Sequence, residues 1–207
     1  MKIYFDGCSW TRGEELHTPE HNRFSRLVCN QLGAQEVNLS MKGGSNDRIV
    51  RNLYCDSTIK ECDLAVIQMT FPARTEYFKG GEWRKVNPMQ NYTKWLHGEN
   101  GDIKRLGEKF ADHADFWKYF YMQVANREYF ITKERIQFET IRDNLRRRGI
   151  PLIIGTINRW TLLDFDIQMN NNNRHKCTYG HPNEEGHRLL AARILKILKS
   201  YQETGLL

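Results

Sequence analysis

The sequence has 207 residues, of which 40% are hydrophobic, 12% aromatic and 27% charged, and this composition excludes the disordered, collagen-like and coiled-coil classes. The net charge of +6 is spread along the chain, and the single basic run, 146–148, falls at an expected helix end, so no nucleic-acid partner is expected. Five cysteines without a C-x-x-C pair argue against a disulfide framework. No apolar run reaches eighteen residues, so a cytoplasmic protein without a membrane partner is expected.

Strand and helix patterns alternate along the first third of the chain. In chain order the patterns predict a strand at 2–6, a helix at 24–32, a strand at 36–39, a helix at 46–59 and a strand at 63–69. The last of these strands contains a continuous apolar run, which is typical of a strand covered on both faces. Repeated alternation of this kind predicts a parallel sheet with helices on both sides.

Residues 70–127 interrupt the alternation and hold twelve of the 24 aromatic residues. Such an aromatic-rich insertion could form a second shell of the core or a cap over a site. Phe116, Trp117, Phe120 and Tyr121 recur at helical spacing, which favours burial of their rings against the core. We expect one domain, 1–207, that carries this insertion.

Regular patterns resume after the insertion. A long helix is expected to end at Gly149, a fourth strand to span 151–157, and a final helix to follow Pro182. The predicted class is therefore α/β, with a parallel sheet between two helical layers. Because ligands of open parallel sheets bind beyond the carboxyl ends of the strands, the functional residues are expected in the loops that follow them.

Those loops contain the groups that acyl transfer requires. Ser9 follows the first strand, Gly43 lies in the glycine-containing loop after the second, and Thr70 follows the third, while His181 precedes the final helix. A hydroxyl is a poor nucleophile at neutral pH, so an imidazole is needed to take its proton. Backbone and side-chain donors would stabilise the oxyanion that develops on the substrate.

These blocks, in this order, resemble the SGNH (GDSL-type) hydrolases. The resemblance rests on Gly7-Cys8-Ser9-Trp10-Thr11, on Asn38 with Gly43, on the end of the third strand, and on His181-Pro182-Asn183 with Gly186-His187. It implies a three-layer α/β/α fold around about five parallel strands, and hydrolysis of an ester or related acyl group without a metal or other cofactor. It also implies that Ser9 is the nucleophile and an oxyanion donor through its N–H, that Gly43 is a second donor, and that His181 is the general base.

Three positions depart from the family pattern. Cys8 stands where an aspartate usually precedes the serine, and Thr70 stands nearest to the usual oxyanion-hole asparagine. Thr178 occupies the place of the aspartate three residues before the histidine, which leaves a Ser-His dyad or an incomplete triad. A backbone carbonyl could hold the imidazole in a dyad, or Asp164 or Asp166 could orient it instead. We expect catalysis to be weakened or specialised, because a triad carboxylate stabilises the imidazolium.

The substrate is expected to be a small-molecule or carbohydrate-linked acyl ester. Trp10, beside the serine, could line its pocket or only cover the core. Arg74 could contact substrate or form an exposed ion pair with Glu76. The compact chain is also similar to small SGNH-like proteins of bacteria and their tailed viruses.

Three other functions remain open alternatives. Loss of the family residues favours a binding or structural module for carbohydrate or protein that keeps the fold without turnover. The ligand types of His175, Cys177, His181 and His187 suit zinc, but their spacing matches no zinc motif. Nucleotide binding lacks a glycine-rich phosphate loop of either common pattern.

Overall fold

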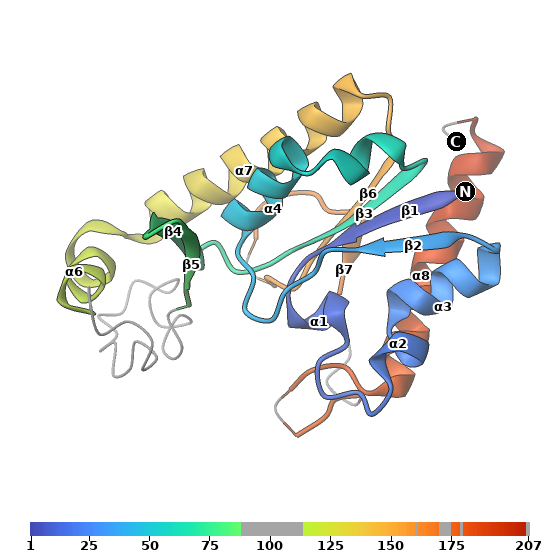
Figure 1. Cartoon of the computed structure of the whole chain (residues 1–207), viewed down its shortest axis with the longest axis horizontal. Coiled ribbons are helices and arrows are strands. Elements are labelled where there is room, and N and C mark those ends of the chain that lie inside the picture. Colours follow the sequence, from blue (N-terminus) through green and yellow to red (C-terminus); the bar gives the residue numbers. More distant parts are fainter. Residues whose placement is uncertain (88–113, 160, 170–174, 179, 206–207) are drawn as a thin grey trace.

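A five-stranded parallel sheet forms the centre of the molecule (Figure 1). The computed structural model describes residues 1–87, 114–159, 161–169, 175–178 and 180–205. The strand order is β2-β1-β3-β6-β7, all parallel. In that order the strands span Gln35–Asn38, Lys2–Asp6, Leu64–Met69, Leu152–Thr156 and Ile167–Gln168. Every residue of the central strand β3 is buried, as its continuous apolar pattern predicts.

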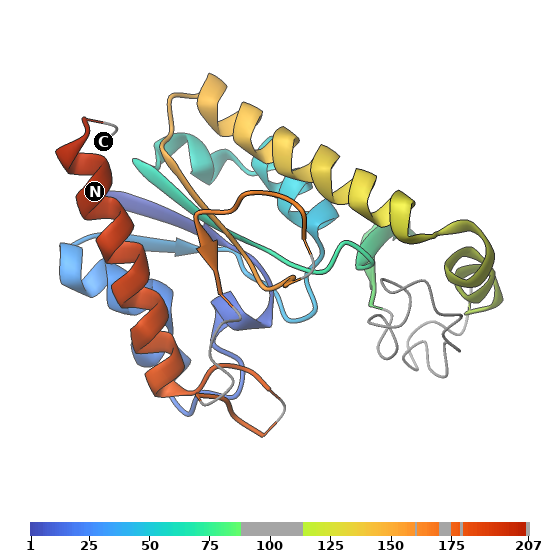
Figure 2. The same cartoon turned by 180° about the vertical axis from the view of Figure 1, so that it is seen from behind.

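Helices cover both faces of this sheet (Figures 1 and 2). On one face, α3 (Phe24–Leu32) and α8 (Glu184–Glu203) pack over Ile3, Phe5 and Val66. On the other face, α4 (Asn46–Cys55) and α7 (Arg127–Arg147) pack over Tyr4, Ala65 and Ile67. The alternation of side chains along β1 and β3 thus divides the core into two apolar layers. The predicted three-layer α/β/α class is confirmed.

Two regular elements differ from the prediction. The expected helix 46–59 ends at Cys55, and a separate 3₁₀ helix, η1, spans Ser57–Glu61. Asp56 separates them because its carboxylate accepts a hydrogen bond from Thr58 N at 2.8 Å and so caps the second helix. The two-residue strand β7 carries too short a pattern to be predicted.

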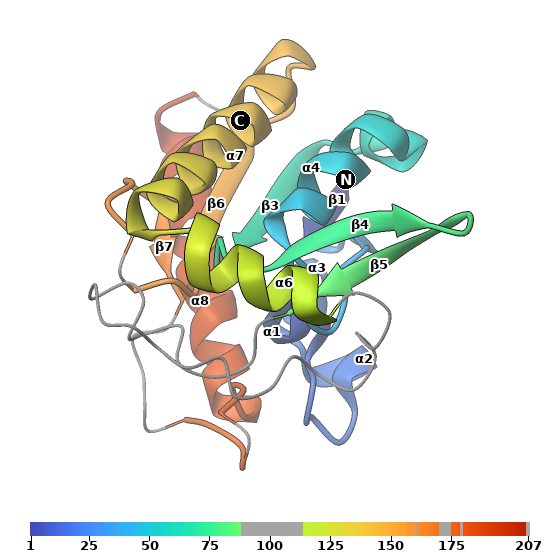
Figure 3. The ribbon, with the colours of Figure 1, turned by 90° about the vertical axis from the view of Figure 1, so that its left-hand side faces the viewer.

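The insertion contains more regular structure than its sequence suggests. Its antiparallel hairpin consists of β4 (Thr75–Lys79) and β5 (Glu82–Val86), and the chain later forms α6 (Ala114–Tyr119) and the π-helical turn η3 (Phe120–Val124). Figure 3 shows the hairpin and α6 beside each other, and Figure 1 places both at the end of the sheet where β3 finishes. The part of the insertion at 88–113 lies outside the described residues.

The aromatic rings of the insertion are only partly buried, so their predicted packing holds for some of them. Tyr121 is buried in a small separate cluster with Ala73, Val86 and Phe130. Phe116 is 58% exposed although it belongs to the same helical pattern. The insertion therefore has a core of its own, distinct from the two layers that flank the sheet.

Two short helices connect β1 to α3: α1 (Ser9–Arg12) and α2 (Pro19–Asn22). Figure 1 places α1 at the carboxyl end of β1 and α2 beside α3. Among the helices of the described ranges, none combines the length and the hydropathy required to cross a bilayer.

Candidate active site

Ser9 is the first residue of α1 and lies directly after the turn that ends β1. The turn is tightly packed around Gly7, since a Cβ on Gly7 would lie 2.4 Å from Thr11 Oγ1 and 2.9 Å from Gln68 Oε1. Only glycine fits this position without displacing those groups. Ser9 itself is 6% exposed, so its hydroxyl is held in a fixed, nearly buried position.

His181 and Ser9 meet across 172 positions of sequence. The Nε2 atom of His181 lies 2.9 Å from Ser9 Oγ, which is the contact predicted for a nucleophile and its base. The histidine is held by a tight turn in which Cys177 N donates to His181 O at 2.8 Å and Asn183 N donates to His175 O at 3.0 Å. The structure therefore brings together the two residues that the sequence proposed for proton transfer.

A carboxylate completes this arrangement, and it belongs to Glu15. Its Oε2 lies 2.5 Å from His181 Nδ1 and also accepts a hydrogen bond from His181 N at 3.3 Å. A carboxylate only accepts, so Nδ1 carries the ring proton and Nε2 of the neutral ring is free to accept from Ser9. Ser9, His181 and Glu15 thus form a continuous hydrogen-bonded relay.

The backbone of Glu15 has an unusual conformation, with φ of 71°. A residue with a Cβ in this left-handed region costs about 1–2 kcal/mol. The preceding turn holds it there, since Gly13 N and Glu14 N both donate to Ser9 O, at 3.1 and 3.0 Å. Strain of this kind occurs at functional sites when the surroundings fix the residue. Here the turn begins at Ser9 and directs the Glu15 carboxylate to the histidine.

The prediction that Asp164 or Asp166 orients the imidazole is wrong. Asp166 accepts a hydrogen bond from Ile154 N at 2.7 Å, beside the sheet, and the place next to His181 Nδ1 belongs to Glu15. Asp164 is exposed. No spacing rule in the sequence points to Glu15, because its position depends on a left-handed backbone conformation in an irregular loop.

The predicted oxyanion donors lie in loops that border the turn of Ser9. Gly43 has φ of 66°, and its loop is held against the first turn by Met41 N, which donates to Gly7 O at 3.1 Å. Thr70 is fully buried at the end of β3, and its N–H donates to Asn46 Oδ1 at 2.7 Å. The roles of Ser9 N–H, Gly43 N–H and the Thr70 hydroxyl as oxyanion donors stay predictions.

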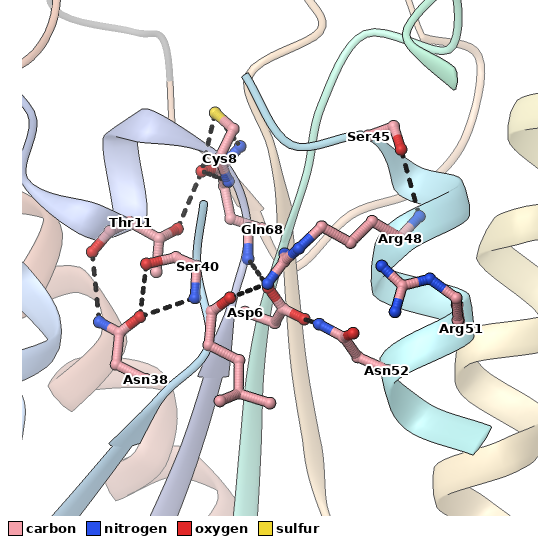
Figure 4. A network of polar contacts seen from close by, with 12 residues as sticks. Asp6, Cys8, Thr11, Asn38, Ser40, Ser45, Arg48, Arg51, Asn52 and Gln68 are labelled. Atoms are coloured by element: carbon pink, nitrogen blue, oxygen red, sulfur yellow. Dashed lines mark hydrogen bonds and ion pairs between the residues drawn. The ribbon is translucent and has the colours of Figure 1, made fainter. Parts of the chain in front are cut away.

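A buried polar network holds the first two loops in place (Figure 4). Asp6, at the end of β1, accepts hydrogen bonds from Arg48 Nη1 and Asn52 Nδ2, both at 2.8 Å, and from Gly7 N at 2.7 Å. Arg48 also donates to Leu39 O, at the start of the second loop. Because Asp6 is 0% and Arg48 7% exposed, this pair lies in the interior and links β1 to α4.

Gln68 links α1 to the central strand in the same network (Figure 4). Its Oε1 accepts from Thr11 Oγ1 at 2.9 Å and from Cys8 N at 3.3 Å, while its Nε2 donates to Met69 O at 3.0 Å. The amide thereby satisfies the polar groups on both sides of the turn that carries the serine.

Trp10 lies in a setting considered for it, whereas Arg74 does not form the ion pair expected of it. Trp10 is half-buried, packs against the apolar layer of α8, and lines a small pocket with Met169, Pro182 and Leu190, among others. The expected pair of Arg74 with Glu76 is wrong, because Glu76 accepts from Arg51 Nε at 2.6 Å instead. A contact of Trp10 or Arg74 with substrate stays a prediction.

His187 makes different contacts from those of His181. It is fully buried, its Nδ1 accepts a hydrogen bond from Phe24 N at 3.1 Å, and its ring stacks on that of Phe24 at a centroid distance of 5.8 Å. It therefore satisfies a backbone donor in the first turn of α3. No group of three or more potential metal ligands occurs within the ranges that the structure describes.

The burial of His187 predicts an acid-sensitive fold. Burial, with a smaller effect of His181, lowers the pKa of His187 to about 4, from 6.5. Since the folded-state pKa is the lower one, stability is full above pH 6.5 and falls as the pH is lowered towards 4. The corresponding loss is about 3 kcal/mol. Urea unfolding at pH 7 and at pH 4 measures it.

Two variants identify the group responsible. In His187→Gln the acid-dependent loss between pH 6.5 and pH 4 should be smaller than in the wild type. His21→Gln, at an exposed position, should keep the wild-type dependence. Equal pH dependence in His187→Gln and wild type would assign the effect to other groups.

Comparison with known proteins bears on the fold. No protein-family model matches the sequence, and no curated protein matches it. Among solved structures, a carbohydrate esterase, described as having an active site with divergent catalytic and non-catalytic binding functions, superposes with a TM-score of 0.55 at 10% identity over 96% of this chain and 64% of that one.

Two further solved structures are similar along nearly their whole length. TesA has a TM-score of 0.48 and 13% identity over 97% of this chain and 99% of its own. A member of the lipolytic G-D-S-L family from Veillonella parvula has a TM-score of 0.41 and 14% identity over 96% and 98%. At identities of 10% to 14% these similarities concern the fold alone. The chain shares the α/β fold of the carbohydrate esterase, with which it superposes at a TM-score of 0.55.

Proposed function

We propose that the protein is a serine-dependent esterase or deacylase that uses Ser9, His181 and Glu15. The observation that carries this proposal is the relay from Ser9 Oγ through both ring nitrogens of His181 to the Glu15 carboxylate, with contacts of 2.9 and 2.5 Å. The three side chains come from distant segments and are held in hydrogen-bond contact. That arrangement meets the geometric requirement for nucleophilic catalysis by a hydroxyl.

The reaction follows from the proton positions in the relay. His181 Nε2 takes the proton of Ser9 Oγ as the oxygen attacks the acyl carbonyl carbon, and Glu15 stabilises the imidazolium that forms. The tetrahedral oxyanion collapses, the bond to the alcohol breaks, and His181 gives its proton to the leaving oxygen. A water molecule then attacks the acyl-Ser9 carbonyl while His181 accepts its proton, and the carboxylic acid is released as Ser9 recovers its hydrogen.

Glu15 removes one of the two arguments for an inactive binding module. That alternative rested on the missing asparagine after the third strand and on Thr178, which is exposed and stands where the family has a carboxylate. The carboxylate is present in this protein but comes from the turn after the nucleophile. The substrate class proposed is an acyl ester of a small molecule or a carbohydrate, in keeping with the carbohydrate esterase among the solved structures of this fold.

Active-site labelling tests the proposal directly. The wild-type protein should hydrolyse nitrophenyl acetate and react with a fluorophosphonate probe, and mass spectrometry of the digested product should find the label on Ser9. Ser9→Ala should lose both reactions while keeping its thermal unfolding midpoint. A wild-type protein that resembles Ser9→Ala in both assays would contradict the esterase function.

A further inference from the structure

The hairpin of the insertion returns the chain to the second loop of the candidate site. Lys85 Nζ, on β5, donates a hydrogen bond to Lys42 O at 2.8 Å. Asn87 follows the end of that strand, and its Nδ2 lies 3.4 Å from the position that a Cβ on Gly43 would occupy. An amide donor from the insertion therefore lies beside the glycine whose N–H is a predicted oxyanion donor.

Arg74 fixes the orientation of the Asn87 side-chain amide. Its Nε donates to Asn87 Oδ1 at 3.1 Å, and its Nη1 donates to Thr70 Oγ1 at 2.8 Å. Because the guanidinium occupies the acceptor oxygen of each side chain, the Asn87 N–H and Thr70 O–H donors face away from it. Among the residues that the structure describes, none accepts a hydrogen bond from Asn87 Nδ2.

The charge of Arg74 also acts on the turn that carries the nucleophile. Burial by itself raises the pKa of the Cys8 thiol, yet the cation of Arg74 is the largest of the effects that lower it, and the net shift is downwards. Cys8 Sγ lies 3.8 Å from Ser9 Oγ. In addition, Arg74 forms no ion pair with a carboxylate among the described residues. A cation so placed favours negative charge that develops near Ser9.

We propose that Asn87 is a catalytic residue whose Nδ2 donates a hydrogen bond to the oxyanion formed on Ser9, and that Arg74 is the positioning residue that orients it together with Thr70. This proposal rests on the esterase function proposed above. It assigns a side-chain oxyanion donor to the residue that follows β5, in addition to Thr70, which stands directly after β3. The insertion thereby contributes a side chain directly to the proposed chemistry.

Substitution of Asn87 tests this assignment by steady-state kinetics. Asn87→Ala should lower kcat for nitrophenyl acetate by about 10²- to 10³-fold, with KM nearly unchanged, because the lost contact forms only in the transition state. Asn87→Asp should lose at least as much, since it replaces the donor by an anionic acceptor. Asn30→Ala, at an exposed position on α3, is the matched control and should behave as wild type.

Arg74 is tested through its coupling to Asn87. Arg74→Gln should lower kcat in the wild-type background, and should cost much less when Asn87 is already alanine, because it then has no amide to orient. Arg74→Lys, which keeps the charge but not the two-sided fork, should recover only part of the loss. A purely structural role would instead give additive losses that follow the thermal unfolding midpoint.

The results separate this proposal from the esterase function. In Asn87→Ala, prolonged treatment with the fluorophosphonate should still label Ser9, because nucleophile and base are intact. Suppose that the wild type is active. The role of Asn87 alone would then be overturned if Asn87→Ala kept the wild-type kcat, or if only its KM changed. A wild type that neither hydrolyses the ester nor takes the label would overturn both proposals.

Discussion

Glutamine in place of Glu15 is expected to lower kcat for ester hydrolysis by about 10⁴-fold, the loss found when the corresponding carboxylate of a serine protease becomes an amide. The amide cannot stabilise the imidazolium, and its NH₂ group can pair with Nδ1 of His181 only in the wrong tautomer. In that tautomer Nε2 carries a proton and no longer accepts the one on Ser9. Steady-state kinetics with nitrophenyl acetate measures the change.

The neighbouring residue provides a matched control. Glu14 lies in the same loop, but its carboxylate pairs with Lys42 at 2.6 Å rather than with the histidine. Glu14→Gln should therefore keep the wild-type kcat. Equal activities for Glu15→Gln and Glu14→Gln would show that the contact with His181 does not serve catalysis.

Methionine in place of Arg48 is expected to lower the free energy of unfolding by about 3–5 kcal/mol. The substitution keeps most of the apolar stem but leaves the Asp6 carboxylate buried without its cation, with Asn52, Gly7 N and Tyr4 as its remaining partners. The loss arises from the uncompensated charge rather than from a cavity. Chemical denaturation at pH 7 measures it.

Two comparisons check that explanation. Adding Asp6→Asn to Arg48→Met should recover part of the stability, because the buried charge is then absent. Arg146→Met, at an arginine whose side chain is 80% exposed and pairs with Asp143, should change stability by less than about 1 kcal/mol. A loss in Arg48→Met no larger than that of Arg146→Met would contradict a structural role for the buried pair.

The regular elements of the fold were predictable because the chain repeats its patterns there. The bounds Lys2–Asp6 and Phe24–Leu32 agree with the predicted strand and helix. Apolar periodicity and a glycine stop at Gly7 and Gly33 provide that information locally. The sequence does not predict the hairpin β4–β5, because β4 is mostly half-buried and β5 mostly exposed, so neither strand alternates between buried and exposed residues.

Of the candidate site, Ser9 and His181 could be predicted from the sequence, whereas Glu15 and Asn87 could not. Ser9 and His181 stand next to regular elements, so parallel-sheet geometry indicates where each of them lies. Glu15 and Asn87 stand in irregular segments. A left-handed backbone conformation directs Glu15 to the site, and the guanidinium of Arg74 orients Asn87. Neither feature leaves a periodic signal, so neither residue was proposed from sequence.

The turn from Ser9 to Glu15 has a consequence for how the catalytic groups assemble. Seven consecutive residues carry both the attacking oxygen and the anion, so these two are set relative to each other by one local backbone conformation. The imidazole alone arrives from a remote segment, and it contacts both partners through opposite ring edges. Displacement of the segment that carries His181 would break both contacts in a single event, so the proposed reaction would require this segment to be fully docked.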